Sequence, residues 1–237
     1  MTAERHYCHQ TAESVTVHAD EIADAVDGLV EIDASQVTSG TFPDARVAAS
    51  NVTQHRAAAA TGWVWISRQS AVGLSAVEFT GLSTYARYRI DMHGVLPSND
   101  GVSLFMRVST NNGSSYDSGA ATYNYVLSSV KGAGTAQDIG GAATAFILVG
   151  NSSGWFMDNG GAISAWNGHV ELYNASQAAH FHAQWKLSGG ENSASDWTQH
   201  NGSGRYNAAV NVNAARIAVG SGTFTTGIFD LYGLKAS

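Results

Sequence analysis

The sequence has little charge, almost no cysteine or proline, and no long apolar run. Charged residues make up 13% of its 237 residues, about half the usual share of roughly 25%. Cys8 is the only cysteine, so an intrachain disulfide is excluded. No apolar stretch reaches the roughly 18 residues of a transmembrane helix, and the start, MTAERHYCHQ, lacks the apolar core of a signal peptide. These absences predict a protein that is made in a cytoplasm and does not insert into membranes.

Glycine, small polar residues and apolar residues are abundant. The chain contains 26 glycines, and 44% of its residues are hydrophobic. The high apolar share argues against disorder, because disordered chains have too few apolar residues to form a core. The composition predicts an all-β protein whose solubility rests on Asn, Ser and Thr rather than on Lys and Glu.

The net charge of −7 is concentrated at the N-terminus. Residues 1–45 hold nine acidic residues and one basic residue, whereas the other 192 residues hold ten acidic and eleven basic residues. The nearly neutral remainder offers no basic stripe, so we expect no binding to nucleic acid. The acidic end suits docking onto a basic surface of a partner, and it equally suits a solvated region that has no partner.

The first 31 residues contain one short helical pattern. Asp20 can cap a helix, and Ile22, Val26 and Leu29 follow at helical spacing. A helix of two turns is marginal alone in water and needs a partner surface. We therefore interpret residues 1–31 as an attachment segment.

The next segment, residues 32–56, has an unusual apolar spacing. Its larger apolar residues fall five apart, at Ile32, Val37, Phe42, Val47 and Val52. Residues five apart lie on opposite faces of a strand and about 140° apart on a helix, so neither element buries them together. Such a chain must kink repeatedly or wrap around copies of itself, which predicts an intertwined stalk with these five residues in contact between chains. A polar interdomain linker is the alternative.

Residues 35–55, SQVTSGTFPDARVAASNVTQH, resemble a segment of bacteriophage tail fibres and related virion spikes that often precedes a globular tip. The pieces TSGTF, DARVAASN and VTQH carry this resemblance. Residues 79–119, from FTGLSTYARYRI to SSYDSG, look more loosely like the tip or spike domains that follow such stalks. The resemblance implies a homotrimer and a virion fibre or spike, of a tailed phage or of a phage-like particle such as a gene transfer agent.

The rest of the chain, residues 57–237, reads as one domain of strands. Alternating or short apolar runs predict strands, and Gly, Asn, Ser and Asp between them predict turns, including HNGSG at 200–204. The predicted strands are 62–67, 75–82, 85–95, 102–110, 121–131, 144–150, 169–175, 180–187, 214–220 and 224–234. This pattern predicts an antiparallel β-sandwich tip, with a jelly roll as the expected version.

Aromatic residues beside polar loops point to carbohydrate binding. Sugar rings stack their apolar faces on Trp and Tyr, while Asp and Asn bind hydroxyl groups, and loops at one end of a sandwich are where binding usually resides. The candidate glycan-binding residues are Tyr116, Asp117, Trp155, Asp158, Trp166, Asn167 and Trp197. The alternative is that these rings plug the ends of the sandwich or the interfaces between subunits. Trp63 and Trp65, just after the stalk, are expected at the junction with the stalk or between subunits.

Metal binding has weaker signals. His180 and His182 alternate on a predicted strand and so share a face, as do HxH motifs that bind metal in some trimeric phage fibres. His6, Cys8 and His9 offer at most three ligands from one chain. Asp100 and Asp117 could contribute to a Ca²⁺ site, but no EF-hand spacing is present. We expect no required cofactor.

Catalysis finds little support in the sequence. There is no GxSxG, HExxH or phosphate-binding loop. A glycosidase needs two converging carboxylates, and Glu78 and Glu171 on predicted strands are the pair that could face one groove. We therefore expect a non-enzymatic virion protein that attaches to a host-surface glycan, binds other virion proteins through residues 1–31, and lies on the particle surface. A polysaccharide-degrading tip and a purely structural capsid or neck decoration are the alternatives.

Overall fold

The structure is a computed structural model that describes residues 62–132, 134–150, 155–160, 164–175, 177–191 and 197–235. The predicted attachment segment, its helix and the predicted stalk lie outside these residues, as do the proposed interchain contacts of Ile32, Val37, Phe42, Val47 and Val52. The cluster of His6, Cys8 and His9 lies outside them too. Those interpretations stay predictions.

The described residues form twelve strands and no helix. The strands are β1 (Gly62–Ser70), β2 (Ala76–Phe79), β3 (Arg87–Pro97), β4 (Leu104–Ser109), β5 (Tyr123–Lys131), β6 (Ala136–Ala143), β7 (Phe146–Val149), β8 (Trp166–Tyr173), β9 (His180–Gly190), β10 (Trp197–Ala209), β11 (Ala214–Val219) and β12 (Phe224–Lys235). All paired strands run antiparallel. The prediction of an all-β antiparallel protein is confirmed.

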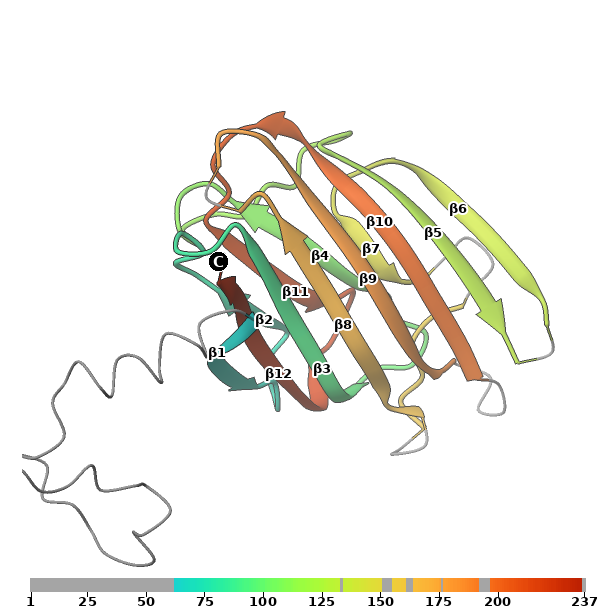
Figure 1. Cartoon of the computed structure of the whole chain (residues 1–237). Coiled ribbons are helices and arrows are strands. Elements are labelled where there is room, and N and C mark those ends of the chain that lie inside the picture. The colour runs from blue at the N-terminus through green and yellow to red at the C-terminus, as the bar shows by residue number, and fades with distance from the viewer. Residues whose placement is uncertain are drawn as a thin grey trace, which may run out of the picture. The chain divides into compact units, whose positions relative to one another are not determined.

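The strands form two sheets that pack face to face (Figure 1). The larger sheet has the order β1-β12-β3-β8-β9-β10-β5-β6, and the smaller sheet has the order β2-β11-β4-β7. Eight of these strands, β1-β12-β3-β8 and β2-β11-β4-β7, make the two four-stranded sheets of a jelly roll. The hairpins β5–β6 and β9–β10 are inserted into this framework and extend the larger sheet beyond β8.

The core lies between the sheets and continues under the two inserted hairpins. Alternate residues of each strand point inward, as the period of two requires. Phe146 on β7 is fully buried, and its ring lies 4.8 Å from that of Tyr123 on β5 and 6.3 Å from those of Phe181 and Trp185 on β9. The short strand β7 therefore joins the hairpin extension to the smaller sheet.

Each of the ten predicted strands corresponds to an observed one, but β6 and β10 were missed. The prediction of a turn at HNGSG, residues 200–204, is wrong, because these residues lie in the middle of β10. Two glycines there do not form a turn; they leave space for aromatic rings that pack against the strand. A Cβ on Gly202 would lie 2.2 Å from the ring of Trp185, and one on Gly204 would lie 2.6 Å from the ring of Phe146.

Candidate functional site

The outer face of the eight-stranded sheet carries a row of polar side chains that crosses every strand. The strand register places one residue of each strand in this row. In strand order the row is Arg68, Asp230, Asp91, His169, Lys186, Asn201, Ser128 and Asp138. An antiparallel sheet with one solvated face has polar residues there, but an unbroken row of hydrogen-bonding groups also makes a surface that can bind a polar ligand.

The outer face is hollowed into a groove of about 920 Å³. Its lining comes from β3, β8, β9, β10, β5 and β6, and includes Arg87, His169, Glu171, Lys186, Asn201 and Asp138. These strands are neighbours in that order, and five steps of about 4.8 Å give the groove a length of roughly 24 Å across the strands. The groove is therefore long enough for an extended ligand and exists only because the inserted hairpins widen the sheet.

One end of the groove is organised around the carboxylate of Glu171. This carboxylate accepts hydrogen bonds from the guanidinium of Arg87 and, at 2.5 Å, from the hydroxyl of Tyr173. The guanidinium lies over the ring of Tyr173 at 4.8 Å and over that of Trp63 at 5.3 Å. Partial burial raises the pKa of Glu171, but the bonds from Tyr173 and Arg87 outweigh it and hold the pKa below its ordinary value. The carboxylate is therefore ionised at neutral pH and fixed in orientation.

His169 occupies the next position along β8 on the same face. Burial lowers the pKa of its imidazole, and the positive charge of Arg89 lowers it further. The imidazole is therefore neutral at pH 7 and can both donate and accept hydrogen bonds. Together with Lys186 and Asn201, which are exposed on β9 and β10, it gives the centre of the groove donors and acceptors in close succession.

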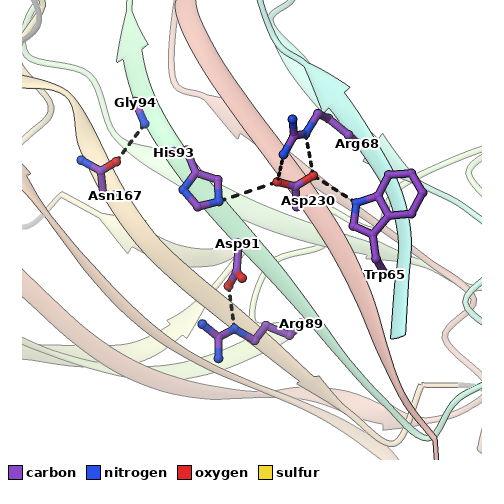
Figure 2. Close-up of polar contacts among 8 residues, drawn as sticks. All are labelled: Trp65, Arg68, Arg89, Asp91, His93, Gly94, Asn167 and Asp230. Atoms are coloured by element: carbon purple, nitrogen blue, oxygen red, sulfur yellow. Dashed lines mark hydrogen bonds and ion pairs between the residues drawn. The ribbon is translucent and has the colours of Figure 1, made fainter. Parts of the chain in front are cut away.

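Beside the groove, a set of ion pairs fastens the edge strand β1 to β12 and β3 (Figure 2). Asp230 on β12 has a side chain that is only 2% exposed. Its carboxylate accepts two hydrogen bonds from Arg68, at 2.8 and 2.9 Å, and one from the indole of Trp65 at 3.3 Å, while the imidazole of His93 lies 3.7 Å away. The hydrogen bonds from Arg68 lower the pKa of Asp230. Asp230 therefore has all its charge satisfied within the protein.

We expect Asp230→Asn to lower the melting temperature at pH 7 by roughly 2–4 °C, because the amide cannot accept both bonds from Arg68. The pKa of Asp230 is lower in the folded state than in the unfolded state, so its contribution is present above the unfolded pKa and is lost as the pH falls through the folded pKa. Thermal unfolding at pH 7 and pH 3 is the measurement. A difference between parent and variant that is as large at pH 3 as at pH 7 would contradict this assignment.

The predicted glycan-binding residues do not converge on one site. Asn167, at the start of β8, pairs with Ser188 on β9, and Trp197 opens β10, so these two lie toward the same end of the sheet. Tyr116 and Asp117 lie toward the other end, where Asp117 accepts a hydrogen bond from Tyr206 at 2.7 Å. The candidate residues therefore lie at both ends of the sheet rather than at one.

Several of these side chains are already used by the fold. Trp166 is fully buried and donates its indole N–H to the carbonyl of Gly190 at 3.0 Å, and Trp155 is almost buried. The ring of Tyr116 lies 4.5 Å beneath the guanidinium of Arg216. Trp197, which is half exposed, is the predicted aromatic residue with the most free surface.

The two predicted aspartates stabilise their own loops. Asp117 accepts from the backbone N–H of Gly119 at 2.9 Å as well as from Tyr206. Asp158 is buried and accepts from the N–H of Gly160 and the hydroxyl of Ser164, both at 2.9 Å. These contacts have the form expected of loop supports, and the carboxylates present few free oxygen lone pairs to a ligand.

His180 and His182 share the outer face of β9, as the period of two predicts. The ring of His180 is engaged through Nδ1 with the carbonyl of Tyr206 at 3.2 Å. Within the described residues, no three His, Cys, Asp or Glu side chains gather closely enough to hold a metal ion. Neither of the Ca²⁺ candidates, Asp100 and Asp117, belongs to such a group of three in the described part of the chain.

The carboxylate pair considered for catalysis is separated by the fold. Glu78 points outward from β2 of the smaller sheet, where the guanidinium of Arg216 lies 3.8 Å away. Glu171 points outward from β8 of the larger sheet. Because the two sheets pack face to face, these outer surfaces lie on opposite sides of the sandwich, and the two carboxylates cannot flank one glycosidic bond.

Sequence reasoning missed the groove because it lies on strands rather than loops. The alternation of His169, Glu171 and Tyr173 on β8, and of Gln184 and Lys186 on β9, was the available signal. It reads as an ordinary solvated face until the register of β10, β5 and β6 is known.

The described residues contain no helix with the length and apolar character needed to cross a membrane. Comparisons with known protein families, with curated protein sequences and with solved structures found no match to this chain.

Proposed function

We propose that this domain is the non-enzymatic receptor-binding tip of a virion fibre or spike, and that its groove binds a bacterial surface polysaccharide. The groove on the outer face of the larger sheet carries the proposal. It is open, elongated and lined by groups that donate and accept hydrogen bonds, as a polysaccharide chain requires. The resemblance of residues 35–55 to phage fibres supports the setting on a tailed phage or gene transfer agent.

The charges of the groove favour a ligand with little net charge. Arg87 and Glu171 form an ion pair, and the neutral imidazole of His169 adds no charge at pH 7. Lys186 and Asp138 leave one cation and one anion among the lining residues. A strongly charged polymer would find no matching potential here, whereas the hydroxyl groups of a neutral glycan can bond to each of these side chains.

The state of the carboxylates supports binding without cleavage. A glycosidase needs a carboxylic acid whose pKa is raised so that it can protonate the leaving group. The pKa of Glu171 is instead lowered, and its oxygens are held by Arg87 and Tyr173. Asp138, on β6, lies four strand steps from Glu171 on β8, or roughly 19 Å, which exceeds the spacing of either type of glycosidase.

We expect the double change Lys186→Ala and Asn201→Ala to weaken polysaccharide binding at least about tenfold, because neighbouring strands lose a charged donor and an amide at the centre of the groove. Titration of the full chain against purified capsular polysaccharides and lipopolysaccharide O-chains is the measurement. Glu78→Ala, on the opposite side of the sandwich, is the matched control and should bind like the parent.

Two further measurements distinguish this proposal from its alternatives. Trp197→Ala should change the affinity less than about twofold, because the residue lies outside the groove. A larger loss than in the groove variant would favour a loop site instead. Release of reducing ends from the polysaccharide, abolished by Glu171→Gln, would favour a degrading enzyme. A parent chain that binds none of the polysaccharides while the particle still adsorbs to cells would overturn the groove as the receptor site.

A homotrimer, held by the segment 32–56 and joined to other virion proteins through residues 1–31, completes the proposal. The five-residue apolar spacing supports it, because chains that wrap around one another can bury all five residues.

A further inference from the structure

Exposed apolar side chains are concentrated along one edge of the domain. Of the eleven large hydrophobic residues that are exposed in the described part, seven lie on β1, in the turn after it, or on its neighbour β12. These seven are Trp63, Val64, Trp65, Ile66, Val72, Leu74 and Ile228. Apolar residues scattered singly over a surface need no explanation, but a concentration of this kind marks an interaction surface.

The strand that carries this surface is an unprotected edge. β1 pairs with β12 on one side and with no strand of the described chain on the other. Natural proteins guard such edges with Lys, Pro, bulges or a covering element. β1 has a bulge between Trp65 and Ser67, but its only charged residue, Arg68, is bound to Asp230. The opposite edge of the same sheet, β6, exposes no large hydrophobic residue.

The chain itself indicates what covers this edge. Gly62, the first residue of β1, is preceded by 61 residues, so association of copies through those residues would hold their β1 strands at a high local concentration. The two faces of β1 differ, since Trp63 and Trp65 project on the outer face with Tyr232, and Val64 projects on the inner face with Gly233. Two different apolar surfaces on one strand suit a head-to-tail contact, which forms a ring when the rotation between copies closes.

We propose that the β1 edge is a contact between copies of this chain, in a ring of three where the Trp63–Trp65 side of one copy lies against the Val64 side of the next. The proposal takes its stoichiometry from the trimer of the proposed function, and its surface from the exposed apolar edge alone. It assigns β1 to assembly, next to Arg87 at one end of the groove, and leaves the lining from β8, β9, β10, β5 and β6 free for a ligand.

Cross-linking tests the contact at one residue. Val64 is 39% exposed and Val210, in the turn after β10, is 38% exposed, so the two valines form a matched pair. In a full-length Cys8→Ser background, we expect V64C to give covalent dimers with a bis-maleimide at low micromolar concentration, and V210C to stay monomeric on denaturing gels. One cysteine per chain limits the product to dimers. Equal dimer yields from the two variants would overturn the proposal.

A second measurement does not depend on a new cysteine. We expect the backbone amides of β1 to exchange with solvent deuterium at least about tenfold faster in V64D than in the parent, because the open edge is then covered less often. V210D should exchange like the parent, and equal melting temperatures of V64D and V210D establish that both fold. Unchanged protection of β1 in V64D would contradict a contact at this edge.

The two proposals fail separately. If V64C gives dimers but the chain binds no polysaccharide, the proposed contact at β1 stands and the proposed receptor site is wrong. If the chain binds polysaccharide through Lys186 and Asn201 but V64C gives no dimers, the receptor site stands and the contact at β1 is wrong.

Discussion

Phe146→Ala is expected to lower the free energy of unfolding by about 3–5 kcal/mol. Phe146 is fully buried and contacts the rings of Tyr123, Phe181 and Trp185, which come from the inserted hairpins. The smaller side chain would leave a cavity that the rigid sheets cannot close, because β7 is only four residues long and is held by β4. Urea unfolding of the parent and the variant is the measurement.

The neighbouring residue Ile147 supplies the control. It lies on the opposite face of β7 and is only partly buried, so Ile147→Ala should cost less than about 1.5 kcal/mol. We also expect Phe146→Ala to weaken binding in the groove, since the strands that line it lose their support. A cost below about 2 kcal/mol for Phe146→Ala would show that the extension is held mainly by its backbone pairing.

Acid should destabilise the protein between pH 6.5 and 4 through one buried histidine. His200 on β10 is fully buried; its Nδ1 lies 2.7 Å from the hydroxyl of Ser129, and its ring lies 5.2 Å from that of Trp166. Burial lowers the pKa of His200 to about 4. In the unfolded chain the pKa is about 6.5, so the unfolded state binds the extra proton in this window and stability falls as the pH decreases, by about 3 kcal/mol in all.

His200→Asn isolates this effect, because asparagine can still bond to Ser129 and does not titrate. We expect the variant to lose about 3 kcal/mol less than the parent between pH 6.5 and 4, whatever its stability at pH 7. Gln199→Asn, on the same strand as His200, changes no titratable group and should keep the slope of the parent. Parallel slopes for the parent and His200→Asn would mean that folding does not lower the pKa of His200.

The local pattern of apolar and polar residues predicted most of the strands, but it did not predict which strands pair with one another. The alternation in RYRIDMH and HFHAQWKL was sufficient for β3 and β9, because each buries every second residue. In β10, Asn201, Gly202 and Gly204 look like a turn, since the rings of Trp185 and Phe146 that require those glycines lie far away in the sequence. β6, AQDIGGAA, has few large apolar residues because it is an edge strand whose residues are mostly exposed.

The site was harder to predict for the same reason. The polar residues of the groove come together only when β10 pairs with both β9 and β5, which are about 50 residues apart in the chain. Trp166 and Asp158 lie among glycines and serines that suggested a binding loop, yet the sheets bury both of them. A sequence shows which residues can bind a ligand, whereas the long-range register decides which of them face solvent together.

The two hairpins that widen the larger sheet have a consequence for how such a chain can change over time. Each hairpin is inserted in the chain between two strands of the jelly roll. The hairpin β5–β6 follows β4 and precedes β7, and the hairpin β9–β10 follows β8 and precedes β11. The hairpins near β6 can therefore become longer or shorter, or carry different outward side chains, without any change in the sequence of β1 and β12 at the far edge. Variation in the proposed receptor groove is in this way separated from the β1 edge that we propose joins copies of the chain.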